Sequence, residues 1–310
     1  MSFIELKEVN KSFNQNQILN DISLSIEKGD FFGIVGPSGA GKSVLMKTLL
    51  GIYLPDKGQV IINSKNIEED KSLKNIIGFV PQNSSLYPDL SVFSNMKYFG
   101  KLYGMKLKDI KERSKILLGD MGLSSVSNKK LKSLSGGMNR RVNIACSMLH
   151  NPAILILDEP LSGLDPLLRK QILDLILRIQ QTGKTIIISS HFMNELESLC
   201  NKVAVISNGE IATVGGPKEI RDKYSPYYEV KIRTYPGKYK SLLEALKRNG
   251  VLIQKVEMSQ RDLILYLPKS ANPRTQLGKI VSTSDKYGES LLEIGMNTLS
   301  FAEVYREIVQ

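Results

Sequence analysis

A glycine-rich segment at residues 36–43 carries the residue types that bind phosphate groups. It reads GPSGAGKS and fits the pattern G-x-x-x-x-G-K-S, with Gly36, Gly41, Lys42 and Ser43 in the defined positions. Glycines let backbone amides converge on phosphate oxygens, the lysine neutralises phosphate charge, and the serine hydroxyl can ligate magnesium. The other members of this predicted loop are Pro37, Ser38, Gly39 and Ala40. The segment therefore predicts a nucleoside triphosphate site.

Two carboxylates, Asp158 and Glu159, follow the aliphatic run at residues 154–157. In phosphate-loop enzymes an aspartate in this place holds the metal ion, directly or through water. The next residue, Glu159, could then activate or orient the attacking water. The alternative is a pair of solvated loop acids, but four aliphatic residues rarely end that way by accident.

A second segment, LSGGMNRR at residues 134–141, also has features of an anion site. A serine and two glycines open a predicted helix, and the amides at a helix start attract negative charge. The segment has no lysine and no preceding strand, so by itself it would bind phosphate weakly. It suits a γ-phosphate whose charge is partly neutralised elsewhere.

The elements expected around these segments alternate between strands and helices. A buried strand at 31–35 precedes GPSGAGKS and a helix at 44–50 follows it, which is the required context for a phosphate loop. Further strands are expected at 22–26, 59–62, 76–80, 153–157, 185–188 and 203–206, with helical spacing at 167–179. This alternation favours an α/β fold with a mostly parallel sheet, and residues 90–150 predict a helical insert.

The pattern changes near residue 224. Strands are expected at 228–233, 251–256, 263–267 and 291–294, and helices at 241–248 and 275–281. The order βαββαβ suggests a small ferredoxin-like α+β module. Ser300 and Glu303 form a capping box that predicts a last helix. The predicted domains are therefore 2–223 and 224–310.

Composition excludes several classes of protein. The chain has 310 residues, of which 42% are apolar, enough for a sizeable core. Its longest apolar runs fall short of the ~18 residues that cross a bilayer, and the start MSFIELKEVN lacks the apolar segment of a signal peptide. We expect an intracellular, soluble polypeptide in which Cys146 and Cys200 are reduced packing residues.

The net charge of +11 is concentrated in one region. Residues 97–141 hold twelve basic side chains against three acidic ones. This region is either a solvated helical face or a surface that works beside anionic lipid headgroups or the acidic loops of a partner. Nucleic acid is a third possibility, but the aromatic residues here show no binding-motif spacing.

Taken together, the motifs resemble those of the ATP-binding cassette (ABC) family. GPSGAGKS resembles its Walker A motif, Asp158 and Glu159 the end of its Walker B motif, and LSGGM its signature. The resemblance covers about residues 2–223, with every motif in family order. It implies a P-loop ABC-type nucleotide-binding domain, in which a mostly parallel sheet is accompanied by an antiparallel subdomain and a helical insert. Met138 departs from the glutamine that is typical of the signature.

Four more residues carry the resemblance. Gln82 stands at the place of the Q-loop glutamine, Asp165 in the D-loop, His191 at the switch histidine, and Phe13 at the aromatic that stacks on adenine. The resemblance implies ATP and Mg²⁺ as cofactors, with Ser43, Gln82 and Asp158 at the metal and Glu159, His191 and Gln82 in catalysis.

The resemblance also implies a dimer of identical or different chains. In this family the signature of one subunit closes over the nucleotide held by the Walker A motif of the other, and hydrolysis separates the subunits. The signature residues expected to contact the partner's nucleotide are Leu134, Ser135, Gly136 and Gly137, and Asp165 of the D-loop is also expected to bind nucleotide.

The resemblance is strongest to bacterial export ATPases of the ABC-2 or drug-resistance type, through residues 137–141, 162–166 and 297–305. It implies a peripheral protein at the cytoplasmic face of the cell membrane that works with a separate integral-membrane permease. An importer ATPase and a soluble clamp on nucleic acid or ribosomes are the alternatives. Clamps usually carry two cassettes or a long coiled-coil insert, so no nucleic-acid partner is expected. The C-terminal module is regulatory, dimer-stabilising or an inert appendage.

Overall fold

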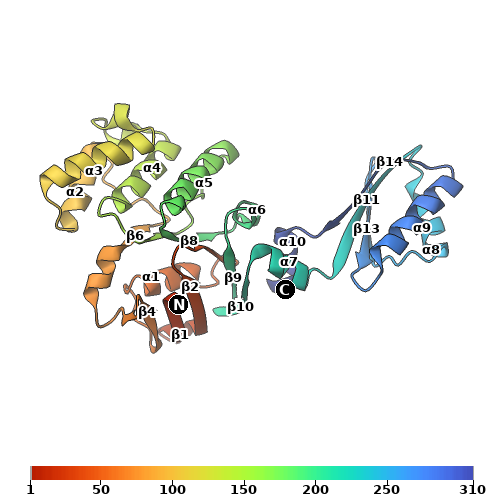
Figure 1. Ribbon diagram of the computed structural model, residues 1–310, viewed down its shortest axis with the longest axis horizontal. Coiled ribbons are helices and arrows are strands. Elements are labelled where there is room, and N and C mark those ends of the chain that lie inside the picture. The colour runs from red at the N-terminus through yellow and green to blue at the C-terminus, as the bar shows by residue number, and fades with distance from the viewer. Residues whose placement is uncertain (1, 310) are drawn as a thin grey trace. The chain divides into compact units, whose positions relative to one another are not determined.

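The computed structural model describes residues 2–309, which form two compact units (Figure 1). The first unit ends at Pro217 and the second runs from Lys218 to Ile308. The division lies at the start of α7 (Pro217–Tyr224), whereas the sequence prediction puts the boundary at the end of this helix. Lys269 donates a hydrogen bond to the backbone oxygen of Asp222 at 2.6 Å, which ties α7 to the second unit.

A six-stranded sheet, in the order β10-β9-β3-β8-β7-β6, forms the centre of the first unit. Five strands are parallel neighbours: β3 (Phe31–Val35), β6 (Ile77–Val80), β7 (Ile154–Leu157), β8 (Thr185–Ser190) and β9 (Lys202–Ser207). Only β10 (Glu210–Gly215) runs antiparallel to its neighbour. Parallel strands end at one edge of a sheet, so the segments that follow β3, β6, β7 and β8 meet there.

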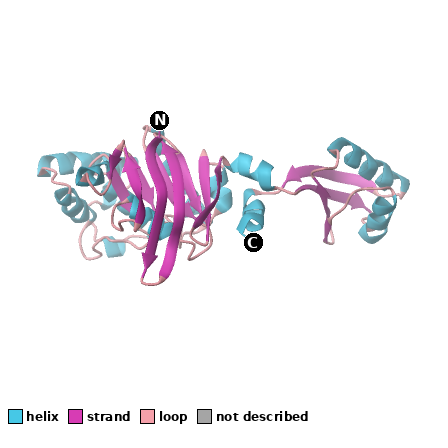
Figure 2. Ribbon diagram, turned by 90° about the horizontal axis from the view of Figure 1, so that it is seen from below, coloured by secondary structure: helices cyan, strands magenta, loops and turns pink. Residues whose placement is uncertain are grey.

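An antiparallel sheet, in the order β2-β1-β4-β5, packs against this centre. Its strands are β1 (Ser2–Phe13), β2 (Asn16–Glu27), β4 (Lys57–Ile62) and β5 (Lys65–Asn66), of which β1 and β2 are the longest (Figure 2). The strand β1 was not predicted. Its alternating apolar pattern shifts between Leu6 and Val9, where Glu8 adopts a left-handed backbone with φ of 47°.

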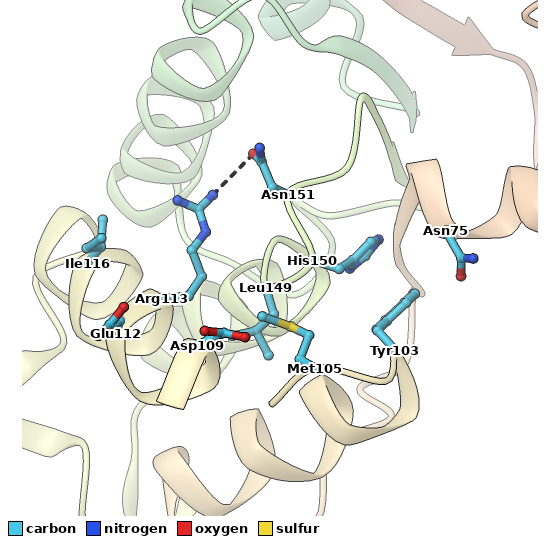
Figure 3. A pocket seen from close by; sticks show the side chains of 10 residues that line it. All are labelled: Asn75, Tyr103, Met105, Asp109, Glu112, Arg113, Ile116, Leu149, His150 and Asn151. Atoms are coloured by element: carbon cyan, nitrogen blue, oxygen red, sulfur yellow. Dashed lines mark hydrogen bonds between the residues drawn. The ribbon is translucent and has the colours of Figure 1, made fainter. Parts of the chain in front are cut away.

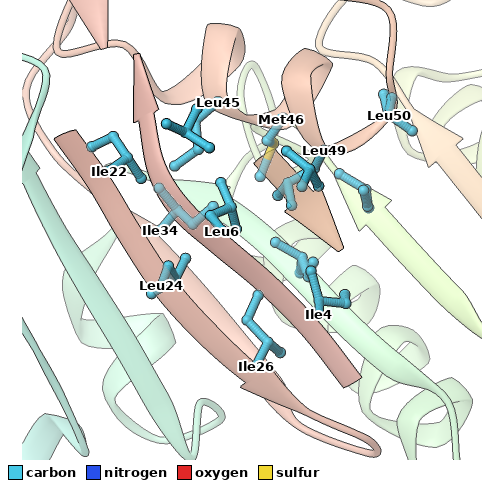
Figure 4. Close-up of a cluster of buried hydrophobic side chains, with 14 of the residues drawn as sticks. Ile4, Leu6, Ile22, Leu24, Ile26, Ile34, Leu45, Met46, Leu49 and Leu50 are labelled. Atoms are coloured by element: carbon cyan, nitrogen blue, oxygen red, sulfur yellow. The ribbon is translucent and has the colours of Figure 1, made fainter. Parts of the chain in front are cut away.

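The core between these sheets also holds the helix α1 (Lys42–Leu49) in place. Apolar side chains of β1 and β2 pack with Ile34 of β3 and with Leu45, Met46 and Leu49 of α1 (Figure 4). All of these residues are buried. Because α1 follows GPSGAGKS directly, this packing sets the direction in which the loop presents its amides.

The predicted helical insert is confirmed. It comprises α2 (Val92–Leu102), α3 (Leu107–Asp120) and α4 (Gly136–Ser147), with short 3₁₀ turns η2 (Ser124–Val126) and η3 (Leu131–Ser133). Another short turn, η1 (Lys71–Ile76), precedes β6, while α5 (Pro166–Gln181) and α6 (Met193–Glu197) follow β7 and β8. The insert has its own buried contacts, as Met96, Ile110 and Val142 show.

The second unit has the predicted βαββαβ order, and its antiparallel sheet has the order β12-β13-β11-β14. The elements are β11 (Tyr227–Tyr235), α8 (Tyr239–Arg248), β12 (Lys255–Met258), β13 (Leu263–Pro268), α9 (Pro273–Lys286) and β14 (Ser290–Thr298). Both α8 and α9 lie on one side of the strands (Figure 1), and Leu242 and Ile280 pack there with Val230 and Leu265. This is the ferredoxin-like arrangement.

One strand of this unit was predicted in the wrong place, at 251–256. The apolar residue Val251 is buried, but its amide donates to the backbone oxygen of Leu246 and so ends α8. The predicted capping box is confirmed at the last helix, α10 (Phe301–Val309). The Ser300 amide donates to Glu303 Oε2 at 2.8 Å, and the Glu303 amide donates to Ser300 Oγ at 3.3 Å.

The two cysteines are buried free thiols, as predicted. Burial raises the pKa of both Cys146 and Cys200, so neither thiol forms a thiolate readily. Within residues 2–309, no helix has the length and apolar character that a bilayer crossing requires.

Candidate functional site

A cavity of about 370 Å³ lies where GPSGAGKS, the end of β6 and the end of β7 meet. It brings together eight of the predicted residues, namely Phe13, Ser38, Gly39, Gly41, Lys42, Ser43, Gln82 and Glu159. Ile18 and Val44 also line it, and sequence reasoning missed both because aliphatic side chains carry no chemical signature. The residues come from five separate segments of the chain.

The glycine loop is shaped to receive an anion. Gly41 has a φ of 101°, which side chains disfavour, and a Cβ atom at Gly36 would lie 2.4 Å from the backbone oxygen of Ile206. The first turn of α1 contains no acidic residue, and no side chain caps it. Helix amides left without a cap, together with the positive end of the helix dipole, favour binding of phosphate.

Lys42 is buried beside this loop. Its Nζ donates to the backbone oxygens of Gly36 and Pro37, each at 2.9 Å, and lies 3.9 Å from Glu159 Oε1. Burial lowers the pKa of Lys42, and the charges of Glu159 and Asp158 act in the opposite direction. The ammonium group is therefore held between the loop and the acidic pair, where it can turn toward phosphate oxygens.

The predicted metal residues supply only oxygen ligands, which Mg²⁺ prefers. Ser43 Oγ lies 3.2 Å from Asp158 Oδ1, so the hydroxyl and the carboxylate are close enough to bind the same metal ion. Gln82 lines the same cavity. Magnesium usually takes one or two protein ligands and completes its shell with water and phosphate. The donor set fits this cation.

Glu159 and His191 form a close pair. His191 Nδ1 lies 2.8 Å from Glu159 Oε2, and the glutamate side chain is only 10% exposed. Glu159 adopts a left-handed backbone with φ of 47°, which is uncommon for a residue with a side chain. The carboxylate faces Lys42 with one oxygen and His191 with the other.

Phe13 stands at the edge of the cavity with 37% of its surface exposed. Its ring packs edge-on against Tyr53, with 5.0 Å between the ring centroids. This contact holds the ring at the cavity, and Lys11 Nζ lies over the ring at 5.6 Å from its centroid. Tyr53 follows the exposed turn after α1, and no sequence pattern pointed to it.

The signature residues do not line this cavity in the chain itself. Ser135 and Gly136 are exposed at the start of α4, whereas Gly137 is buried and a Cβ atom there would lie 2.9 Å from Leu168 Cδ2. Ser135 Oγ accepts a hydrogen bond from the Met138 amide at 3.3 Å. Met138 takes part through its backbone, so the departure from glutamine leaves this turn intact.

The remaining signature residue, Leu134, is half-buried, and Asp165 is exposed. The Asp165 carboxylate accepts from the Leu168 amide at 2.9 Å and caps α5. The structure therefore brings the Walker A and Walker B residues together, while Ser135, Gly136 and Asp165 are exposed outside the cavity.

A larger cavity, of about 610 Å³, lies between α3, the turn that follows α2, Asn75 of η1 and residues 149–151 after α4 (Figure 3). It contains none of these motif residues. Tyr103 and His150 stack there with 3.6 Å between their ring centroids, and Arg113 donates to Asn151 Oδ1 at 3.3 Å. The sequence pattern did not single out this place.

Comparison with known proteins identifies the family. Residues 19–162 match the profile of the ABC transporter family, and residues 130–197 also match that of an AAA domain described as a putative AbiEii toxin of a type IV toxin–antitoxin system. The linearmycin resistance ATP-binding protein LnrL of Bacillus subtilis (strain 168) is 33% identical over 260 residues, which cover 82% of this chain and 83% of that protein.

Two further comparisons agree. Nod factor export ATP-binding protein I of Cupriavidus pinatubonensis is 34% identical over 272 residues, covering 87% of this chain and 82% of that protein. The solved structure of cbiO1 from Clostridium perfringens, part of the ABC transporter complex cbiONQ, matches with a TM-score of 0.66 at 28% identity, over 80% of this chain and 95% of that one. Because the relatives from Bacillus subtilis and Cupriavidus pinatubonensis match over more than four fifths of both lengths, the chain belongs to the ATP-binding subunits of ABC transporters, a family of ATPases.

Proposed function

We propose that this chain hydrolyses ATP to drive export through a separate integral-membrane permease, as a peripheral subunit at the cytoplasmic face of the membrane. The observation that carries the hydrolytic part is that Lys42, Ser43 and Glu159 line one cavity. Asp158 contacts Ser43 at 3.2 Å and His191 contacts Glu159 at 2.8 Å. The direction of transport is inferred from relatives named for drug resistance and for export.

In this proposal the residues in and beside the cavity bind the phosphates, the base and the metal ion, or act on the attacking water. Lys42 and the amides at the start of α1 bind the phosphates, Phe13 stacks on the base, and Ser43, Asp158 and Gln82 hold Mg²⁺. The metal ion, when bound, neutralises charge that develops on the phosphoryl oxygens. Glu159 orients the attacking water and accepts its proton, and His191 fixes the glutamate carboxylate through the 2.8 Å contact.

The same proposal gives the exposed signature residues a place in a head-to-tail dimer. Ser135 and Gly136 are exposed at the start of α4, where amides and the helix dipole suit a γ-phosphate held by a second subunit. The dimer closes over ATP and opens when the γ-phosphate is hydrolysed from the nucleotide. This would supply the mechanical step of transport.

The permease would contact the helical insert. Six large apolar side chains between Gln82 and Leu134 are exposed, namely Tyr87, Leu90, Tyr98, Leu102, Leu107 and Ile116. Grouped apolar exposure of this kind marks a protein contact, and the basic residues of 97–141 suit the membrane surface. The cavity in Figure 3 borders the same insert and could receive a protruding segment of the permease.

A pull-down from detergent-solubilised membranes tests the proposed function. The tagged chain should recover a protein with several membrane spans, and Leu102→Asp with Ile116→Asp should lose it while keeping ATP binding. The control is a double variant in the second unit, Leu252→Asp with Leu292→Asp, which adds the same charge at exposed apolar residues outside the helical insert. Recovery of ribosomes or nucleic acid in place of a membrane protein would overturn the proposal.

A further inference from the structure

Ser189 links the two acidic residues of the site, although no motif singles it out. It lies near the end of β8 and is fully buried. Its Oγ accepts a hydrogen bond from the Glu159 amide and donates one to Asp158 Oδ1, both at 2.8 Å. A hydroxyl offers one donor and can accept as well, so Ser189 uses both capacities on neighbouring residues of one turn.

These two hydrogen bonds act on different parts of the chemistry. Asp158 Oδ1 receives the Ser189 hydroxyl as well as the Ser43 hydroxyl at 3.2 Å, so its carboxylate is held from two sides. The Ser189 hydroxyl also accepts from the amide of Glu159, whose backbone is left-handed with φ of 47°. Ser189 thereby influences the direction of the metal-binding carboxylate and of the Glu159 side chain together.

The sheet explains why this residue is in reach. Strand β8 lies between β3 and β7, and Ile188 pairs in register with Leu157, the last residue before Asp158. On the other side, Ser189 pairs with Ile34 just before the glycine loop begins. The strand therefore carries Ser189 between the two segments that hold Ser43 and Asp158.

We propose that Ser189 is a positioning residue for ATP hydrolysis, which acts through Asp158 and Glu159. It does not touch the cavity, because its hydroxyl points at the two acids from the buried side. Residues that orient a metal ligand typically change metal affinity or activity by about 10- to 100-fold when removed. This inference concerns the ATPase reaction alone and stands whichever way the transporter works.

The test compares Ser189→Ala with Thr185→Val in the full-length protein. Thr185 lies at the opposite end of the same strand, is equally buried, and its hydroxyl accepts from the Gly29 amide at 2.9 Å. Both variants therefore lose one buried hydroxyl that accepts from a backbone amide, but only Ser189→Ala loses a contact with the acids. Thermal melting of both variants, measured first, shows whether each is folded.

Ser189→Ala should lower kcat by about 10- to 100-fold and raise the Mg²⁺ concentration needed for half-maximal activity. Its affinity for ATP without metal should stay within about twofold of the parent, since Lys42 and the glycine loop are unchanged. Ser189→Thr keeps the hydroxyl and should recover much of the activity. Thr185→Val should keep kcat and the Mg²⁺ requirement of the parent.

Ser189→Cys covers the case in which Ser189→Ala does not fold. The thiol fills the space of the hydroxyl but is a weak donor and acceptor, so this variant should fold and still show the loss of kcat. Equal kcat and equal Mg²⁺ requirement in Ser189→Cys and the parent would overturn the proposal. An equal loss in Ser189→Ala and Thr185→Val would also overturn it, because the effect would then be structural.

Discussion

Arg140 donates a hydrogen bond from its guanidinium group to the backbone oxygen of Gln82 at 3.3 Å, and a second to Pro81 at 3.2 Å. Arg140 belongs to α4, the helix that starts at the signature, and Gln82 lines the nucleotide cavity. One side chain thus connects a segment that lines the nucleotide cavity with the helix that begins at the signature. A planar guanidinium can contact two carbonyls at once, which an ammonium group does less well.

We therefore expect Arg140→Met to weaken ATP-driven dimer formation by about fivefold or more, since coupling between sites commonly amounts to ~1–3 kcal/mol. ATP affinity of the monomer should change little. Size-exclusion chromatography at a series of ATP concentrations measures dimer formation, and equilibrium binding measures the ATP affinity of the monomer. Arg141→Met is the matched control, because Arg141 donates to the Met121 oxygen within the helical insert. Equal dimerisation of both variants would contradict the link.

Replacing Glu159 with Gln should lower ATP hydrolysis by at least about 100-fold, the usual contribution of a general base. The amide keeps the shape of the side chain but cannot accept a proton from water. ATP should stay bound, so the variant should accumulate as a dimer. Light scattering with ATP checks the dimer and phosphate release checks the rate. A variant that remains monomeric with ATP would argue against the signature's proposed role.

Phe13→Ala should raise the dissociation constant for ATP by about tenfold, because stacking of a base on an aromatic ring contributes ~1–3 kcal/mol. The rate at saturating ATP should be nearly unchanged, since in the described part of the chain no hydrogen bond or ion pair joins Phe13 to Asp158 or Glu159 and its proposed contact is with the base. Phe13→Tyr keeps the ring and serves as the control. If Phe13→Ala and Phe13→Tyr bound ATP equally well, Phe13 would be a packing partner of Tyr53 only.

His150 should make the stability of the protein depend on pH. Burial lowers the pKa of this imidazole from its ordinary value of 6.5, and the charge of Lys184 adds to this effect. As the pH falls below about 6.5, His150 binds a proton in the unfolded chain, whereas in the folded chain it does so only at a lower pH. The free energy of unfolding therefore decreases as the pH falls from about 6.5 toward the pKa of the folded state. Above that range the contribution is fully retained.

His150→Phe keeps the stack on Tyr103 and removes the titration. The drop in melting temperature between about pH 7.5 and about pH 5.5 should therefore be smaller in this variant than in the parent. The comparison cancels the carboxylates, which titrate in both proteins. An equal drop in both would show that His150 is not responsible.

Much of the nucleotide cavity follows from local sequence. A phosphate loop needs a strand, glycines at set positions and a helix within about twenty residues, and all of these are short-range patterns. The ferredoxin-like order of the second unit was predictable for the same reason, since each strand and helix has its own periodicity. The strand at 251–256 was misplaced because a buried Val251 looks the same in a strand and at the end of a helix.

The sequence by itself thus determined the fold class, the family and the candidate nucleotide residues, because each of the motifs that indicate them is a short continuous stretch of chain. Only the tertiary structure decided that Ser189 holds Asp158 and Glu159, that Arg140 reaches Gln82, and that the signature stays outside the cavity. These contacts join residues about thirty to sixty positions apart, and they depend on the strand order β3-β8-β7 and on where the helical insert packs. Local hydrophobic periodicity carries no information about such neighbours.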